Sequence, residues 1–341
     1  MPGLTYERYG LTGNPFRDLA SENLEDVTLF HVNQEVDQTL RTIRDEIYDK
    51  ENRAVVAVIG DLGSGKTERL RVTAADALER KALVVYFDIT ERTPQVLRGL
   101  AQRFLKAAQD AGKVKTFGAP AWVRRIQALE KLKDEKYDPV DAGKVIAQAL
   151  SDSAPAFLLL NDLHNLIDSR EVDAFARLLK EVADAIKPGV LVMFSCYSSY
   201  LAWLTVNHPA LATRINRTFL LSRLSDDEAA LLIAKKLLAK RVVEDLDPTY
   251  PFDSDAVHLL NEAAAGNPRR LLELSDLSVE YALAHRAYRV DAQIVSTILA
   301  VKPPLSSERP TSPAPPASSK RPLLAPVPGP TKSPYSEGPP R

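Results

Sequence analysis

The stretch of sequence that decides the fold reads Gly60-Asp61-Leu62-Gly63-Ser64-Gly65-Lys66-Thr67. It has the spacing G-x-x-x-x-G-K-T of a phosphate-binding P-loop. The hydrophobic run 54–59 enters the loop directly, and a run of helix-compatible composition, 68–81, leaves it. This order of strand, loop and helix is the context that the motif requires. It disfavours the alternative, a glycine-rich turn in which Lys66 is merely exposed.

The residue types in the loop explain how it would hold a phosphate. Gly60, Gly63 and Gly65 allow backbone conformations that a side chain would block. Successive N–H groups then point at phosphate oxygens, and the helix N-terminus that follows favours an anion. Lys66 is predicted to reach the β- and γ-phosphates of ATP, and the Thr67 hydroxyl to bind Mg²⁺. We therefore expect ATP and Mg²⁺ as cofactors, with the whole loop as the binding segment.

Composition limits the class of protein. The length of 341 residues suggests about two domains, and a hydrophobic content of 45% suffices for a core. The net charge of −1 does not favour nucleic acid binding by the chain as a whole. A local basic patch is compatible with this overall charge. The single cysteine, Cys196, excludes an intramolecular disulfide and fits a reducing compartment. Without an apolar run long enough for a signal peptide or membrane span, we expect a cytoplasmic protein.

The segment 35–223 alternates apolar runs with amphipathic ones. The expected strands are 54–59, 83–87, 156–160, 190–194 and 218–221. The expected helices are about 35–50, 68–81, 94–109, 120–134, 139–152 and 170–186. Near-continuous apolar strands separated by helices predict an α/β fold with a parallel sheet that helices cover on both faces.

From residue 224 the pattern contains only helices, expected at about 226–241, 254–265, 268–285 and 291–300. Ser225 and Glu228 form a capping box before the first of them. We therefore divide the chain into an N-terminal segment (1–34), an α/β nucleotide-binding domain (35–223), a small all-helical lid domain (224–302) and a tail (303–341).

The tail has a composition of its own. It holds 13 of the 24 prolines, mixed with serine, alanine and basic residues. Proline removes backbone donors, and few large apolar side chains remain to bury, so we predict a disordered, partly polyproline-II segment. Its Pro-x-x-Pro spacing, as from Pro313 to Pro316, suits docking on a protein partner. A simple tether is the alternative.

A second nucleotide signal lies at the end of the run 157–160, which continues as Asn161-Asp162. An apolar strand that ends in polar residues places them at the carboxyl edge of the sheet, beside the phosphates. A P-loop enzyme needs an acid there to hold Mg²⁺, and Asp162 is the candidate. The alternative is that Asp162 caps a helix.

The third signal reads Gly266-Asn267-Pro268-Arg269-Arg270. Asn267 suits an N-cap and Pro268 suits the first helical position, which places Arg269 in the first turn. Its guanidinium would then face the nucleotide from the helical domain and suit a γ-phosphate. The alternative is a surface arginine pair, and Arg270 is the better candidate for the surface member.

These three signals, in this order, resemble the AAA+ ATPases over about residues 8–300. The resemblance is closest to the origin-recognition and initiator-type branch and to the related secretion and transposition-helper ATPases of bacteria and archaea. The quoted loop matches the family's Walker A motif. The family's opening segment, which lies near the adenine, is resembled by Tyr9-Gly10-Leu11 with Asn14-Pro15-Phe16. The segment that leads into the family's first helix is resembled by Phe30-His31-Val32-Asn33-Gln34-Glu35.

The resemblance implies roles for several residues. The Ser195-Cys196 turn, after the strand expected at 190–194, falls where the family keeps its polar sensor 1 residue, and Ser195 is the favoured one of the two. Arg214 lies where the family places an arginine finger, which acts on the nucleotide of a neighbouring subunit and implies a homo-oligomer. Arg217 and a plain surface role are the alternatives. Arg269 matches the sensor 2 position.

One departure from the family concerns the Walker B run, whose usual form is Asp-Glu-x-His-x-Leu. The metal-binding Asp falls on Asn161, and the water-activating Glu falls on Asp162. An amide orients a metal-bound water but supplies no charge, and Asp162 is one methylene shorter than Glu. A register shift would instead make Asp162 the metal ligand and leave no acid as base. In either register we expect ATP binding with slow turnover, which suits a switch.

Two functions follow as expectations. The first is a nucleotide-dependent switch in a DNA transaction, such as replication initiation, transposition or maintenance of a mobile element, as the resemblance implies. The second is a nucleotide-dependent regulatory or scaffold protein that binds a protein partner and no DNA. The near-neutral charge favours the second, as does the expected lack of a DNA-reading winged helix between the lid and the tail.

Overall fold

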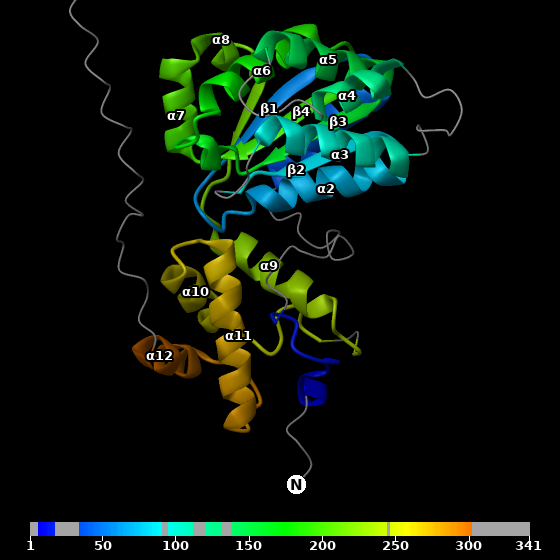
Figure 1. The fold of residues 1–341 in the computed structure, drawn as a ribbon. Coiled ribbons are helices and arrows are strands. Elements are labelled where there is room, and N and C mark those ends of the chain that lie inside the picture. The colour runs from blue at the N-terminus through cyan, green and yellow to red at the C-terminus, as the bar shows by residue number, and fades with distance from the viewer. Residues whose placement is uncertain are drawn as a thin grey trace, which may run out of the picture. The chain divides into compact units, whose positions relative to one another are not determined.

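Five parallel strands form the sheet at the centre of the α/β part (Figure 1). In spatial order they are β2 (Leu83–Asp88), β3 (Ala156–Asn161), β4 (Val190–Cys196), β1 (Ala54–Ile59) and β5 (Arg217–Leu220). This computed structural model describes residues 6–17, 34–90, 95–111, 121–130, 138–243 and 246–301. The strand that enters the P-loop, β1, therefore lies between β4 and the edge strand β5.

Helices cover both faces of the sheet (Figure 1). One face packs against α3 (Val96–Asp110), α4 (Ala121–Glu130), α5 (Pro139–Asp152) and α6 (Val172–Ala185). The other packs against α1 (Gln34–Tyr48) and α2 (Lys66–Glu79). The α/β class expected from the apolar strands is confirmed.

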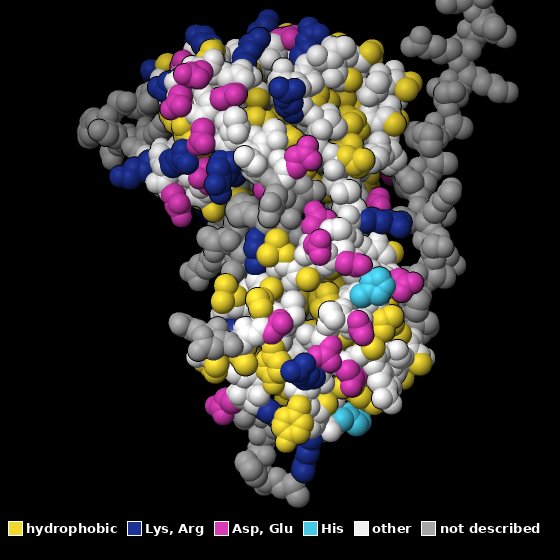
Figure 2. Space-filling model, turned by 180° about the vertical axis from the view of Figure 1, so that it is seen from behind, with side chains coloured by type: hydrophobic (Ala, Val, Ile, Leu, Met, Phe, Trp, Pro, Cys, Tyr) yellow, Lys and Arg dark blue, Asp and Glu magenta, His cyan; other side chains and the backbone are white. Residues whose placement is uncertain are grey.

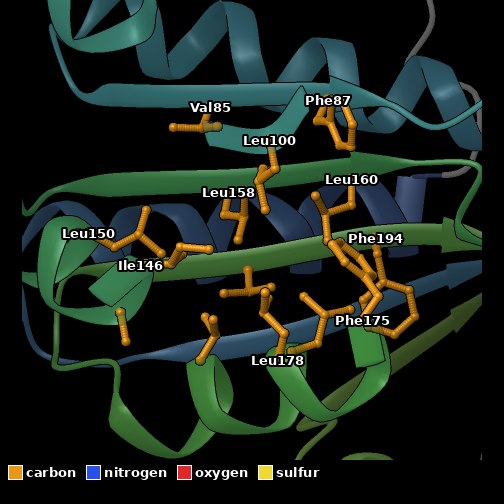
Figure 3. Close-up of a cluster of buried hydrophobic side chains, with 14 of the residues drawn as sticks. Val85, Phe87, Leu100, Ile146, Leu150, Leu158, Leu160, Phe175, Leu178 and Phe194 are labelled. Atoms are coloured by element: carbon orange, nitrogen blue, oxygen red, sulfur yellow. The ribbon is translucent and has the colours of Figure 1, made fainter. Parts of the chain in front are cut away.

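The alternation of side chains along each strand builds these two cores. On β3, Leu158 and Leu160 point to the first face and Phe157 and Leu159 to the second, and all four are fully buried. Figure 3 shows Leu158 and Leu160 among side chains from α3, α5 and α6. Each fully buried leucine or phenylalanine contributes about 1.5–3 kcal/mol, so burial on both faces holds the carboxyl edge of the sheet in place.

The helical part has a core of its own. Its elements are α9 (Asp226–Leu238), α10 (Ser254–Ala263), α11 (Pro268–Ala284) and α12 (Ala292–Val301). The predicted capping box is present: Ser225 Oγ accepts a hydrogen bond from the Glu228 N–H at 3.3 Å, and Glu228 Oε2 accepts one from the Ser225 N–H at 2.9 Å.

The described N-terminal residues belong to this helical core. They begin with a short 3-10 helix, η1 (Tyr6–Tyr9). Tyr9, Leu11 and Phe16 are fully buried among side chains of α9, α10 and α11. Asn14 Nδ2 donates to Asp276 Oδ1 of α11 at 2.6 Å. Placement near an adenine stays a prediction, and the run that resembles the approach to the first helix lies mostly in 18–33, outside the described residues.

Besides η1, three elements were not expected from the sequence: η3 (Leu163–Leu166), α7 (Ser198–Asn207) and α8 (Pro209–Ala212). Helix α7 buries Tyr200 and Leu204, one turn apart, but its exposed side also carries apolar residues such as Val206, so no clear amphipathic stripe marks it. The predicted disordered tail, 303–341, lies outside the described residues. Within the described ranges, every helix is too short or too polar to cross a bilayer.

Candidate nucleotide site

The loop between β1 and α2 has a backbone that only glycine adopts easily. Gly63 has φ 79° and Gly65 has φ 91°, both in the left-handed region. A Cβ on Gly60 would lie 2.5 Å from Ser64 Oγ, which is closer than real Cβ contacts. The spaced glycines of the sequence therefore allow the tight backbone of this loop. Helix α2 begins directly after the loop, at Lys66.

Lys66 is buried inside this loop, with 5% of its surface exposed. Its Nζ donates to the carbonyl oxygens of Gly60 at 3.0 Å and Asp61 at 2.8 Å, and lies 4.7 Å from the ring centroid of Tyr197. Burial lowers the pKa of Lys66, and the Asp162 carboxylate acts in the opposite direction. A buried cation whose hydrogen-bond partners are neutral carbonyls is electrostatically suited to an anion.

Ser64 adds an unused polar group to the same loop. Its side chain is buried, and its Oγ has no hydrogen-bond partner among the described residues. Buried polar atoms are nearly always paired, so the Ser64 hydroxyl is available to accept from or donate to a ligand atom in this loop. With the glycine backbone and Lys66, this hydroxyl makes the loop a good fit for the phosphates of a nucleotide.

Asn161, at the end of β3, lies directly beside the loop and is 5% exposed. Its Oδ1 accepts hydrogen bonds from Thr67 Oγ1 at 3.2 Å and from Ser195 Oγ at 2.8 Å. Its Nδ2 donates to Asp88 Oδ1 at 2.9 Å. The predicted polar residues at the strand end and the predicted magnesium ligand Thr67 are therefore brought together.

Asp162 follows in an unusual backbone conformation. Its φ is 57°, a left-handed value that aspartate tolerates better than most residues. Its N–H donates to Ser195 Oγ at 2.7 Å, and its side chain makes no capping hydrogen bond to η3. Burial raises the pKa of Asp162, while Lys66 opposes that rise. The hydrogen bond to Ser195 thus stabilises its position in the loop after β3, and the Asp162 side chain does not cap η3.

The predicted arginine of the helical part also reaches this site. Asn267 caps α11 through its Oδ1, which accepts from the Arg270 N–H at 3.1 Å, and its Nδ2 donates to the Leu62 carbonyl at 2.7 Å. The Arg269 N–H lies 3.4 Å from the Gly63 carbonyl. The exposed Arg269 side chain has no partner among the described residues, whereas Arg270 pairs with a glutamate of its own helix.

Three comparisons with known proteins test the fold. No family model matches the sequence, and no curated protein matches it. Solved structures do match. The Aeropyrum pernix ORC1 protein in complex with DNA has a TM-score of 0.53 at 17% identity, covering 84% of this chain and 69% of that chain. The Aeropyrum pernix ORC2 protein, in ADPNP–ADP complexes, has 0.57 at 14%, covering 85% and 72%.

A third match is Drosophila ORC bound to DNA, with a TM-score of 0.52 at 17% identity, covering 84% of this chain and 65% of that chain. The chain has the fold of the AAA+ ATPases of origin-recognition type. At these identities the likeness shows the fold alone, and the role of each site residue stays a prediction.

The sensor 1 candidate of the AAA+ fold, Ser195, lies at the centre of the polar contacts. Its side chain is fully buried, and its hydroxyl touches both Asn161 and the Asp162 N–H. Its neighbour Cys196 is buried in β4, and burial raises the pKa of that thiol to about 12. The structure therefore places Ser195, and not Cys196, against Asn161 and Asp162.

We expect Ser195→Ala to lower the free energy of unfolding by about 1–3 kcal/mol, because the Asp162 N–H loses its acceptor in a partly buried site. Urea unfolding measures this as a lower midpoint with an unchanged slope. Ser199→Ala, which removes an exposed hydroxyl from α7, is the matched control and should change the midpoint little. Equal midpoints for the two variants would contradict the role given to Ser195.

The two candidate arginine fingers of the AAA+ fold lie away from their own P-loop. Arg214 precedes β5, and its Nε lies 2.6 Å from Asp184 Oδ1. Arg217 pairs in register with Val56 near the start of β1, whereas the P-loop follows the end of β1. Action on a neighbouring subunit stays a prediction for either residue, and both side chains are exposed.

Sequence reasoning missed three side chains at the site. Asp88 ends β2 next to Asn161, and the signal that identified Asn161, a polar residue after an apolar run, also marks Asp88. The Tyr197 ring lies 3.8 Å from the His164 ring, centroid to centroid, and over Lys66. Burial lowers the pKa of His164 to about 4, so this imidazole is neutral at pH 7. No sequence pattern marked the contacts of Tyr197.

Proposed function

We propose that this chain binds ATP with Mg²⁺ and acts as a nucleotide-dependent switch in a DNA transaction, such as replication initiation, transposition or maintenance of a mobile element. The observation that carries the proposal is the P-loop itself. Its buried Lys66 and orphaned Ser64 are suited to phosphate, and Asn267 and Arg269 contact the same loop from the helical part. ATP in this loop would thus contact both parts of the fold.

Each residue has a proposed role. Lys66 binds phosphate oxygens, and Arg269 senses the γ-phosphate. When bound, Mg²⁺ neutralises phosphate charge. The contact between Thr67 and Asn161 supports the register in which Asn161 occupies the metal-side position and Asp162 is the base. With an amide in place of the usual carboxylate and a short base, we propose slow hydrolysis, so that nucleotide occupancy is the signal.

The DNA part of the proposal is supported by the structural neighbours. Two of the solved structures described above contain DNA, and a third is in ADPNP–ADP complexes. We further propose that the chain assembles into a homo-oligomer through Arg214 or Arg217. Arg214 precedes β5 and Arg217 begins it, and β5 is the edge strand of the sheet, so a neighbouring subunit could approach both residues.

A second candidate function, a nucleotide-dependent regulator of a protein partner, has an observation in its favour. The net charge is −1, and on the face drawn in Figure 2 acidic and basic side chains are interspersed without a continuous basic stripe. DNA-binding surfaces are usually strongly basic. The proline-rich tail would then be the docking segment of the partner.

The test measures molecular size and DNA affinity with and without ATP, for the wild type and Lys66→Ala. For a DNA switch we expect ATP-dependent assembly and DNA binding that weakens with salt, both lost in Lys66→Ala. Nucleotide-dependent assembly without any DNA affinity would favour the protein-partner candidate. If neither ATP nor Lys66 alters assembly or DNA binding, the switch proposal is wrong.

A further inference from the structure

Asp88 lies at the carboxyl end of β2, directly opposite Asn161 in the register of the sheet. Its Oδ1 accepts the hydrogen bond from Asn161 Nδ2 at 2.9 Å. The side chain is exposed, and its second oxygen has no partner within the described ranges. A carboxylate with one oxygen free therefore lies at the same edge as the P-loop.

Asn161 connects this carboxylate to the P-loop. Its amide nitrogen faces the carboxylates of Asp88 at 2.9 Å and Asp162 at 3.2 Å, and its amide oxygen faces the Thr67 hydroxyl at 3.2 Å. This arrangement fixes the amide orientation, because a carboxylate accepts only from the nitrogen side. An aspartate at position 161 would instead place three like charges together, which is unfavourable. The amide at 161 and the acid at 88 thus fit one another.

We infer that Asp88 supplies the carboxylate of the magnesium site that Asn161 cannot, with the Asn161 amide linking it to Thr67. The inference rests on the proposed ATP function. Magnesium in nucleotide sites is held by one or two carboxylates together with waters and phosphates. In this assignment the carboxylate of the magnesium site lies at the end of β2, and the neighbouring strand β3 ends in an amide.

The surrounding charges support this assignment. Asp88 and Asp162 lie on either side of the Asn161 nitrogen, and a cation near this edge relieves their mutual repulsion. In the described part of the chain, no group of three or more His, Cys, Asp or Glu residues forms a metal site by itself. A magnesium ion at this edge would accordingly depend on the phosphates of the nucleotide for further ligands.

The experiment measures the affinity of the full chain for a fluorescent ATP analogue, in a magnesium titration and in EDTA. The variants are Asp88→Asn, Asp88→Ala and the exchanged pair Asp88→Asn with Asn161→Asp. Asp88→Asn retains an oxygen that accepts from the Asn161 amide, so it removes the charge and keeps the hydrogen bond. Asp110→Asn, an exposed residue at the end of α3, is the matched control.

In Asp88→Asn we expect magnesium to bind the nucleotide complex about 10- to 100-fold more weakly, with the affinity in EDTA unchanged. Asp88→Ala should lose at least as much, and the exchanged pair should regain most of the loss, because it restores one carboxylate and one amide. The inference is overturned if Asp88→Asn titrates with magnesium like Asp110→Asn. It is also overturned if the loss is as large in EDTA, which would indicate a structural role.

Lys66→Ala separates this inference from the proposed function. If the wild type binds the analogue and Lys66→Ala does not, while Asp88→Asn keeps its full magnesium dependence, only the role of Asp88 is refuted. If the wild type and Lys66→Ala bind the analogue equally, or neither binds it, the ATP function itself fails, and the inference fails with it.

Discussion

Replacing Lys66 with alanine is expected to weaken ATP binding by about 100- to 10,000-fold. Two charge-assisted hydrogen bonds from its ammonium to phosphate oxygens contribute about 1.5–3 kcal/mol each, and each 1.4 kcal/mol is a factor of ten. The structure supports so large an effect because Lys66 is buried in the loop and its present partners are two carbonyl oxygens and an aromatic ring. Isothermal titration calorimetry with ATP and Mg²⁺ measures the loss.

Thermal unfolding provides the control for this variant. ATP at 100 times its Kd should stabilise the wild type by about 2.7 kcal/mol, which raises Tm by roughly 5 °C in a chain of this size. Lys66→Ala should show almost none of this shift, although it unfolds cooperatively without ATP. Lys106→Ala, which removes an exposed lysine from α3, should keep the full shift. A full Tm shift in Lys66→Ala would show that the ATP that stabilises the chain is not bound by this loop.

The features that the sequence predicts well here are local. Strand bounds follow from apolar runs, since all six residues of β1 and of β3 are buried. The P-loop follows from glycine spacing, because Gly63 and Gly65 adopt left-handed backbone conformations. The start of α11 follows from Asn267 and Pro268, whose capping chemistry acts within four residues.

The features that were missed depend on pairing between distant segments. Asp88 can be assigned to the site only when β2 is known to lie beside β3. The apolar sequences of these two strands do not predict which strands are neighbours. The contact of Asn267 with the Leu62 carbonyl joins residues 205 positions apart. Tyr9 likewise packs against helices that are distant in the sequence. Its polar local sequence does not predict that its side chain is buried.

Asp162→Asn is expected to lower the ATP hydrolysis rate by about 100- to 10,000-fold and to leave ATP affinity nearly unchanged, because the amide cannot accept a proton from the attacking water. The substitution keeps the size of the side chain and suits the left-handed backbone at this position, so it should not disturb the loop. Single-turnover hydrolysis of radiolabelled ATP at saturating Mg²⁺ measures the rate even when turnover is slow.

The stability of the Asp162→Asn variant distinguishes a role of Asp162 as the base from a role in maintaining the loop. Burial raises the pKa of Asp162, so the folded state disfavours the charged form and binds more protons than the unfolded state. This contribution lowers stability as pH rises through the folded pKa, and the neutral amide removes it. Asp162→Asn should therefore unfold at a temperature no lower than the wild type at pH 7, while its hydrolysis falls. A parallel loss of stability and hydrolysis would instead show that Asp162 maintains the loop rather than acting as the base.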